Sequence, residues 1–426
     1  MRLLIALLVA AWVGVPTPAA AQSGPRNCSR LTQNLFVRDV LDEYYLWYQE
    51  LPRLNPANYA TPEAYLDAVR YRPLDETFSY ITSREANEAF YGESQFVGFG
   101  FSTETGEQDM RILQVFPDSP ASEAGLGRGD RILEINGRRV AQLIENGELG
   151  GAFGASEPGV TASILFRTRS GDERRATMTK RVVTIPTVSL TRTFRVDGRT
   201  VGYLFFRNFV NPSYQALDDA FAALREAGAT ELVLDVRYNG GGLVDVAVHL
   251  GSLIAGVPTQ GRVFATFQHN DKNSSLNEDL RFENAPPQTL NLSRLLVITT
   301  RTSASASELV INSLRPYIPV VVIGDSTYGK PVGQYGFPFC DKIVAPVAFK
   351  LVNAQGQGDF FGGIEPNCRA ADDVEHDLGS ADEASLGEAL TFVRTGACST
   401  TSTARALRRA SPQPRAYGWQ SVVNAH

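Results

Sequence analysis

Long apolar runs, histidine and lysine are all scarce in this 426-residue sequence. The apolar run at residues 3–15 is too short to anchor the chain stably in a bilayer, and no later run is long enough to do so. The four histidines form no H-E-x-x-H or comparable cluster, which argues against a metal hydrolase. A net charge of -6 argues against a nucleic-acid binder.

The first 21 residues have the pattern of a secretory signal peptide. A basic residue at position 2 precedes the apolar run, and the small residues Ala19–Ala21 follow it. We therefore expect residues 1–21 to be removed and the mature protein to be exported without a stable membrane anchor. The periplasm is the favoured destination, with the extracellular space as the alternative.

The chain contains only four cysteines: Cys28, Cys340, Cys368 and Cys398. An even number in an exported chain favours disulfides, and their spacing matches no zinc site. Three pairings are open. We predict Cys340 with Cys368, bracketing one lobe, and Cys28 with Cys398, tying the two ends together.

Three regions with different patterns follow the signal peptide. Residues 31–90 show helical periodicity, with a second helical stretch at 62–69. From residue 97, short strands are expected at 111–116, 131–135 and 162–168, with a capped helix near 118–126. The stretches S-P-A-x-x-A-G-L and G-D-x-I-L-x-I-N-G in this region resemble a PDZ domain.

From about residue 184, strands and helices alternate. The expected strands are 201–206, 231–236, 295–299 and 320–324, and the expected helices are 214–226, 244–254 and 307–314. Such repeats predict an α/β domain with helices packed on a sheet. The polar stretch 270–288 is expected to be a loop or an insertion, and the segment after Cys398 a flexible tail.

Two segments contain a candidate nucleophile and a candidate base. The first, residues 301–308, reads R-T-S-A-S-A-S-E, and the second, residues 328–334, reads Y-G-K-P-V-G-Q. A serine attacks only when a neighbouring group takes its proton, and a buried lysine can do so. The chain has five lysines among its 40 basic residues, and arginine could not replace Lys330 as a neutral base. The plainer alternatives are a helix-capping serine and an exposed turn lysine.

A third segment, D-V-R-Y-N-G-G-G at residues 235–242, follows a predicted strand. Its glycines can present backbone N–H groups to a phosphate or to an oxyanion. A phosphate loop would need Lys and Ser or Thr next, and Leu243 is followed by Val and Asp. A Ser-His-Asp site would have to use His249, His269, His376 or His426, and no G-x-S-x-G motif is present.

These three segments, in this order after a PDZ-like domain, resemble the tail-specific or C-terminal processing serine peptidases. The resemblance implies a Ser/Lys dyad in which Ser305 is the nucleophile, Lys330 the general base and Gln334 its support. It assigns the oxyanion hole to the N–H of Ala306 and to one of the glycines 240–242, with Gly241 favoured. No metal or organic cofactor is implied.

The same resemblance implies a multidomain α/β protein. Its parts are a helical N-terminal region (22–95), a PDZ domain (96–183), a crotonase-like α/β peptidase core (184–397) and a tail (398–426). Protein or peptide substrates would place a C-terminal or unfolded segment against the PDZ loop, which consists of Val97, Gly98, Phe99, Gly100 and Phe101. The sequence predicts no oligomeric state.

The sequence departs from the family pattern at three positions: Thr302 and Gly240 replace a common glycine and a common proline, and Pro331 follows the lysine where glycine is usual. None of them removes a side chain that the chemistry needs. Two other functions compete with the peptidase: a non-catalytic peptide-binding scaffold with the same fold, and a crotonase-type enzyme acting on acyl thioesters. The PDZ-like pattern and the signal peptide argue against the second.

Overall fold

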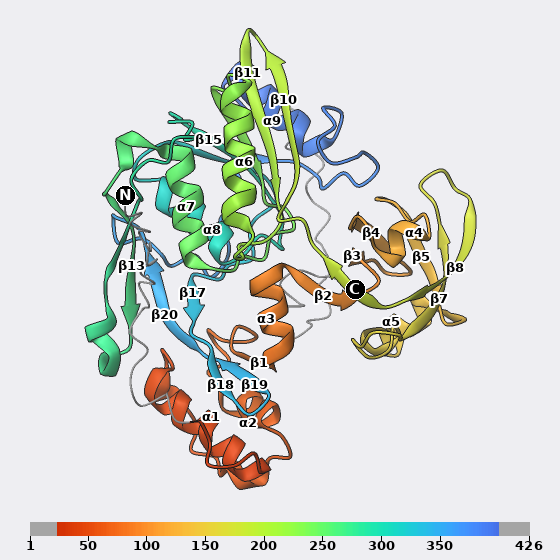
Figure 1. Ribbon diagram of the computed structural model, residues 1–426, viewed down its shortest axis with the longest axis vertical. Helices are drawn as coiled ribbons and strands as arrows, with labels where there is room; N and C mark the ends of the chain where they lie inside the picture. Colours follow the sequence, from red (N-terminus) through yellow and green to blue (C-terminus); the bar gives the residue numbers. More distant parts are fainter. Residues whose placement is uncertain (1–23, 400–426) are drawn as a thin grey trace, which may run out of the picture.

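The computed structural model describes residues 24–399 (Figure 1). The predicted signal peptide and nearly all of the predicted tail lie outside these residues. Within them, no helix has the length and apolar character needed to cross a membrane.

A six-stranded sheet forms the centre of the carboxyl-terminal half, in the order β10-β11-β12-β15-β16-β21. Parallel pairing runs from β11 to β21, and β10 is antiparallel to β11. Parallel strands end at the same edge of a sheet, so the loops after β12 and β15 are neighbours. The strands are β10 (Val188–Val196), β11 (Arg199–Phe206), β12 (Glu231–Asp235), β15 (Leu295–Thr299), β16 (Val320–Gly324) and β21 (Cys368–Arg369).

Helices cover both faces of this sheet (Figure 1). Side chains alternate between the two faces of a strand, so Leu232 and Leu234 of β12 pack with the first group of helices and Val233 packs with α9. The first group is α6 (Ser213–Glu226), α7 (Val244–Ala255) and α8 (Ala306–Leu314), and α9 is Ala384–Thr395. The predicted α/β core is thereby confirmed.

A second sheet, in the order β14-β13-β20-β17, continues from the core. Its strands are β13 (Val263–His269), β14 (Asp279–Arg281), β17 (Val332–Gln334) and β20 (Val347–Val352). The 3-10 turns η5 (Val257–Thr259) and η6 (Asp271–Leu276) flank β13. The stretch 270–288, expected to be a loop or an insertion, contains η6 and the three-residue strand β14, which pairs with β13.

The N-terminal region folds against a hairpin of the core. Its elements are α1 (Arg30–Tyr44), η2 (Tyr48–Glu50), η3 (Pro56–Asn58), α2 (Pro62–Val69), β1 (Tyr80–Ser83) and α3 (Arg84–Glu93). The region is helical as expected, with one short strand, β1, which adds to β19 (Lys342–Ala345), which in turn pairs with β18 (Phe337–Phe339). The ring of Tyr44 lies 4.6 Å from that of Phe337, so α1 and the hairpin share one core (Figure 1).

The PDZ-like part forms a separate sheet in the order β3-β4-β5-β7-β8, with β6 on β5. The strands are β3 (Phe101–Thr105), β4 (Met110–Val115), β5 (Arg131–Ile135), β6 (Arg138–Arg139), β7 (Thr161–Arg167) and β8 (Glu173–Thr179); the helical pieces are α4 (Pro120–Glu123), α5 (Val140–Glu145) and η4 (Leu149–Gly151). A ribbon of β2 (Gln95–Gly98) and β9 (Arg181–Thr184) connects it to the rest. The two predicted boundaries of the PDZ domain, 95/96 and 183/184, fall in this ribbon and stay predictions.

Both disulfides differ from the predicted pairing. Cys28 bonds to Cys340, which joins the start of α1 to the β18–β19 turn, and Cys368 bonds to Cys398 across 30 residues. The prediction was wrong because it assumed that the chain ends meet. In fact the start of α1 packs on the core hairpin, and the end of α9 lies beside β21.

Candidate active site

The turn that carries the candidate nucleophile lies between β15 and α8. Ser305 occupies the N-cap position of α8 with φ 54° and ψ -114°, a backbone conformation that residues other than glycine rarely adopt. Such strain is held in place by the surrounding structure and is concentrated at functional sites. Ser305 therefore does occupy the helix-capping position that the plainer interpretation gave it. A helix cap alone, however, does not require the strained backbone seen here.

The neighbouring serines have structural partners. The Ser303 hydroxyl donates to the carbonyl of Val236 at 2.8 Å, and the Ser307 hydroxyl donates to the carbonyl of Asn239 at 3.0 Å. Both side chains are buried, and both tie the turn to the glycine loop that follows β12. Ser305 instead lines a cavity.

The glycine loop approaches Ser305 so closely that a side chain would not fit. A Cβ on Gly241, which has φ +98°, would lie 2.7 Å from the Ser305 Cβ and 2.8 Å from the Ala306 nitrogen. The Gly241 N–H donates to the Asn239 side chain at 2.9 Å, so it is not free to bind an oxyanion in this structure.

Gly242 is the glycine that lines the cavity, together with Ser305 and Ala306. Within residues 24–399, the N–H groups of Gly242 and Ala306 have no hydrogen-bond partner. The preference for Gly241 over its neighbours is thus not supported by this structure, and Gly242 takes its place as the candidate. Sequence could not distinguish the two glycines because the choice depends on which peptide plane turns toward the cavity.

A buried carboxylate joins the nucleophile and base segments. One oxygen of Glu308 accepts the N–H groups of Ser305 at 2.8 Å and Lys330 at 2.9 Å. The other accepts the Gly329 N–H at 2.7 Å and the Thr327 hydroxyl at 2.5 Å. Burial raises the pKa of Glu308, and these four donors oppose that effect. Glu308 was visible in the motif, but no role for it followed from the sequence.

Lys330 lies in the segment that precedes β17 and lines the same cavity as Ser305. Burial lowers its pKa to about 8, although the negative charges of Asp75 and Glu308 oppose the shift. Its amine lies 5.9 Å from the centre of the Phe78 ring. The structure thus brings the two predicted residues to one cavity, and no hydrogen bond between their side chains is present in this state.

Gln334 lines the cavity as well, but it does not hold the lysine amine. Its side-chain NH₂ donates to the carbonyl of Phe78 at 2.5 Å. Of the departures from the family pattern, Thr302 donates its hydroxyl to the carbonyl of Arg237 at 2.7 Å, and Pro331 lines the cavity beside Lys330. Both fit the site without displacing either predicted catalytic side chain.

The cavity has a volume of about 340 Å³. Away from the polar groups, its wall is apolar and would suit an apolar substrate side chain. The apolar lining includes Leu243, Val244, Leu309, Val332, Phe349 and Leu351.

None of the described histidines lines this cavity. His249 lies between Asp218 and Glu283, at 2.9 Å and 2.8 Å from their oxygens. His269 contacts Tyr335 and Asn277, and His376 contacts Asp373. His426 lies outside the described residues. The described part of the chain therefore offers no Ser-His-Asp arrangement at Ser305.

The only close group of potential metal ligands within residues 24–399 consists of Cys368, Glu388 and Cys398. Because the two sulfurs are bonded to each other, this group offers no thiolate for a metal ion.

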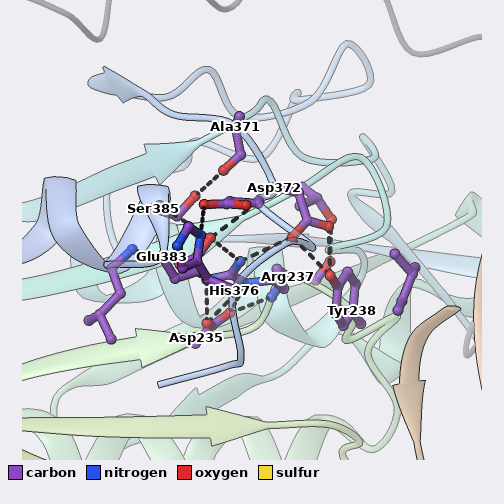
Figure 2. A network of polar contacts seen from close by, with 12 residues as sticks. Asp235, Arg237, Tyr238, Ala371, Asp372, His376, Glu383 and Ser385 are labelled. Carbon is purple, nitrogen blue, oxygen red and sulfur yellow. Dashed lines mark hydrogen bonds and ion pairs between the residues drawn. The ribbon is translucent and has the colours of Figure 1, made fainter. Parts of the chain in front are cut away.

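A buried ionic network fixes the start of the glycine loop (Figure 2). Arg237 has no exposed side-chain surface and binds both carboxylate oxygens of Glu383, at 2.8 and 2.9 Å, as well as Asp235. Asp372 accepts from Arg237 and from the hydroxyl of Tyr238. Burial would raise the pKa of Asp372, but the adjacent guanidinium groups hold it below its usual range. Breaking such a buried pair is expensive, so the loop is held firmly.

This network also reaches the PDZ-like part. Arg128, between α4 and β5, donates to the Tyr238 hydroxyl at 2.7 Å and to Asp372 at 3.1 Å. The predicted peptide-binding loop is close to fully covered: Phe99 and Phe101 are buried, and only Val97 is partly exposed. Strand β3, which follows that loop, is an edge strand of its sheet.

Three family profiles match the chain: Peptidase family S41 at residues 200–370, the S41 N-terminal domain at 32–80, and a PDZ domain at 111–149. The two S41 profiles together match just over half of the chain. The chain belongs to peptidase family S41. The match includes the β11–β21 core, so the strained serine, the lysine and the glycine loop all lie inside the S41 region.

Similar S41 proteins include the carboxyl-terminal-processing protease of Synechocystis, 26% identical over 274 residues that cover 63% of this chain and 61% of that protein. A probable CtpA-like serine protease of Staphylococcus aureus is 23% identical over 335 residues, which cover 78% of this chain and 63% of that protein. The chain therefore spans about three fifths of the length of these relatives.

A putative S41 protease from Bacteroides fragilis superposes with a TM-score of 0.67 and 27% identity, covering 84% of this chain and 96% of that one. The photosystem II D1 C-terminal processing protease superposes with a TM-score of 0.51 at 21% identity, covering 81% and 94%. The predicted fold class is thus confirmed.

Proposed function

We propose that this chain is an exported serine endopeptidase that cleaves C-terminal or unfolded protein segments with a Ser305/Lys330 dyad. The observation that carries the proposal is a single cavity that contains a strained serine and a lysine whose pKa burial lowers to about 8. An amine with that pKa is partly neutral near neutral pH, as a general base requires.

In the first half of the proposed reaction, the neutral Lys330 amine takes the Ser305 proton while the oxygen attacks the scissile carbonyl. The carbonyl electrons move onto its oxygen. The lysine then returns the proton to the leaving amine as the C–N bond breaks. In the second half, the same amine takes a proton from water as the water oxygen attacks the acyl carbon. The C–O bond to Ser305 then breaks, the lysine returns the proton to the Ser305 oxygen, and the acid is released.

The Ala306 and Gly242 N–H groups would bind the oxyanion. Both border the cavity and neither has another partner within residues 24–399. The Ala306 N–H is the first of α8, where the helix dipole favours negative charge. Removing one such donor commonly reduces turnover 10²- to 10³-fold.

The proton transfer requires a closer approach than this state shows, because no hydrogen bond joins the two side chains. Such bonds are often formed only when substrate fills the site. Glu308 limits the movement needed, since it holds both backbone segments through one oxygen.

The PDZ-like part would select the substrate by adding a peptide strand along the β3 edge, with the peptide carboxylate at the loop 97–101. The predicted leader at residues 1–21 would direct export to the periplasm. The export prediction is tested separately by measuring how much protein is secreted and how much is retained in the cell for chains with and without residues 1–21.

A serine-directed covalent probe tests the dyad without knowledge of the substrate. We expect wild type to form one adduct at Ser305 and to degrade an unfolded model protein, and expect Ser305→Ala and Lys330→Ala to lose both activities while remaining folded. A wild-type protein that forms no adduct and cleaves nothing would favour the peptide-binding scaffold instead. Full activity of Lys330→Ala would refute the dyad.

A further inference from the structure

A segment of the N-terminal region, residues 75–79, lies directly against the base. The Phe78 carbonyl accepts the Gln334 side chain at 2.5 Å, and the Phe78 ring faces the Lys330 amine at 5.9 Å. Thr77 and Tyr328 share a hydrogen bond at 3.1 Å between their hydroxyls. The N-terminal region therefore forms one wall around Lys330.

The carboxylate of Asp75 organises this segment from the inside. It is fully buried and accepts the N–H groups of Phe78 at 2.8 Å and Ser79 at 2.9 Å, the Ser79 hydroxyl at 2.5 Å and the Tyr45 hydroxyl at 2.9 Å. The four donors, two at each oxygen, hold the carboxylate in one orientation.

Ser79 ties the same carboxylate to the core. Its hydroxyl donates to Asp75 and accepts the Val347 N–H at 2.9 Å. Val347 begins β20, which pairs with β17 just beyond Lys330. Asp75 is thus held at a defined position relative to the base.

Several titratable groups surround this pair. Tyr80 and Tyr91 line the cavity beside Lys330, and burial raises the pKa of both. Tyr45, just after α1, contacts Asp75, and Arg70, just after α2, donates to the Ser79 carbonyl and pairs with Asp67. Glu308, from α8, accepts the backbone N–H of Lys330. No salt bridge of Asp75 is present within residues 24–399, and the four groups that donate hydrogen bonds to it are neutral.

We propose that Asp75 is a positioning residue for the base: its buried carboxylate stabilises the ammonium form of Lys330 and so limits the fraction of neutral amine available to Ser305. This proposal rests on the proposed function. The electrostatics agree with it, because burial lowers the pKa of Lys330 and the charge of Asp75 raises it partly back, ahead of that of Glu308.

Asp75→Asn tests the proposal with little structural change. The amide oxygen can keep the two backbone N–H groups, and the amide NH₂ can donate to the hydroxyls of Tyr45 and Ser79, which rotate to accept. Without the negative charge, the Lys330 ammonium is less stable. We expect its titration midpoint to fall by about half a unit to one unit, and the acid limb of kcat/KM to move to lower pH by the same amount.

The midpoint is read without activity by competitive acetylation with acetic anhydride across pH, in a Ser305→Ala background, with mass spectrometry of each lysine. The exposed Lys272 is the internal reference. Ser79→Ala is the matched control: it loosens the segment and removes one donor to the Asp75 carboxylate but keeps the charge. We therefore expect its midpoint not to fall below that of Ser305→Ala alone.

An unchanged or raised midpoint in Asp75→Asn would overturn the proposal, as would an equal shift in Ser79→Ala. If Asp75→Asn does not fold, Tyr45→Phe replaces it: removing a donor leaves the carboxylate charge less offset, so we expect a higher midpoint, and no rise would count against the proposal. If the Lys330 midpoint falls as expected in Asp75→Asn but the wild-type protein cleaves nothing, the electrostatic role of Asp75 is supported and the peptidase assignment fails.

Discussion

Glu308 offers the sharpest test of how this site is assembled. Because a single carboxylate accepts the N–H groups of Ser305, Gly329 and Lys330 and the Thr327 hydroxyl, it determines the spacing between nucleophile and base. Glu308→Gln keeps the shape but replaces one acceptor oxygen by an NH₂ donor. The change therefore tests hydrogen bonding and charge with little change in volume.

The glutamine has one favourable orientation. If its oxygen faces the N–H groups of Ser305 and Lys330, its NH₂ faces Thr327, whose hydroxyl can rotate to accept, and the Gly329 N–H, which cannot. One charge-assisted bond is lost and the others become neutral bonds. At about 1.5 to 3 kcal/mol for a bond to a charged group, we expect a stability loss of about 2 to 4 kcal/mol, partly reduced because a buried charge is removed.

For activity, the same loosening should reduce the rate of probe labelling at Ser305 by about 10²-fold, equivalent to about 2.7 kcal/mol. Loss of the negative charge should also lower the pKa of Lys330 below about 8 and move the acid limb of kcat/KM to lower pH. Denaturant unfolding and labelling rates across pH measure both effects. If Glu308→Gln is labelled at the wild-type rate and the acid limb of its kcat/KM profile does not shift, the role assigned to Glu308 is refuted.

Three further results are expected. Gly241→Ala should reduce probe labelling of Ser305 at least tenfold, because its Cβ would lie 2.7 Å from that of Ser305. Gly137, at φ +77° with open space around it, supplies the control: Gly137→Ala should lose about 1 kcal/mol of stability and keep its labelling. Equal labelling of the two variants would contradict this expectation. Burial lowers the pKa of His249, but its two flanking carboxylates raise it overall, so its stabilisation is complete below about pH 6.5 and is lost as pH rises through the raised value. The free energy of unfolding of His249→Gln should not show that decrease with rising pH. A pH profile identical to that of the wild type would show that the ion pairs contribute nothing to stability. Replacing Cys28 and Cys340 by serine opens a link across 312 residues and should cost about 6 kcal/mol in the chain-entropy estimate. Unchanged denaturant unfolding would show that the N-terminal region is held by packing alone.

Local periodicity was sufficient for much of the fold. Strands 131–135, 295–299 and 320–324 and helix 62–69 have the predicted bounds, because alternation and helical spacing are properties of neighbouring residues. Strand β1 was missed for the opposite reason. Its four residues become a strand by pairing with β19, more than 250 residues later in the chain.

The same division applies to the site. The motif around Ser305 and the family resemblance predicted which of three serines is the nucleophile, and the scarcity of lysine drew attention to Lys330. Three features of the site could not be predicted, because each depends on the direction of one peptide plane or side chain. They are the glycine that faces the cavity, the contact of Gln334 with Phe78, and the hydrogen bonds by which Glu308 joins the segments of Ser305 and Lys330.

By itself, the sequence determined the residue types that the proposed chemistry needs and the short elements that carry them, because both depend on residues close together in the chain. Only the tertiary structure decided which cysteines pair, which N–H groups are free, and that Asp75 lies near a base located 255 residues later. These choices depend on sheet order and on burial, which set the dielectric surroundings and hence the pKa of Lys330 at about 8.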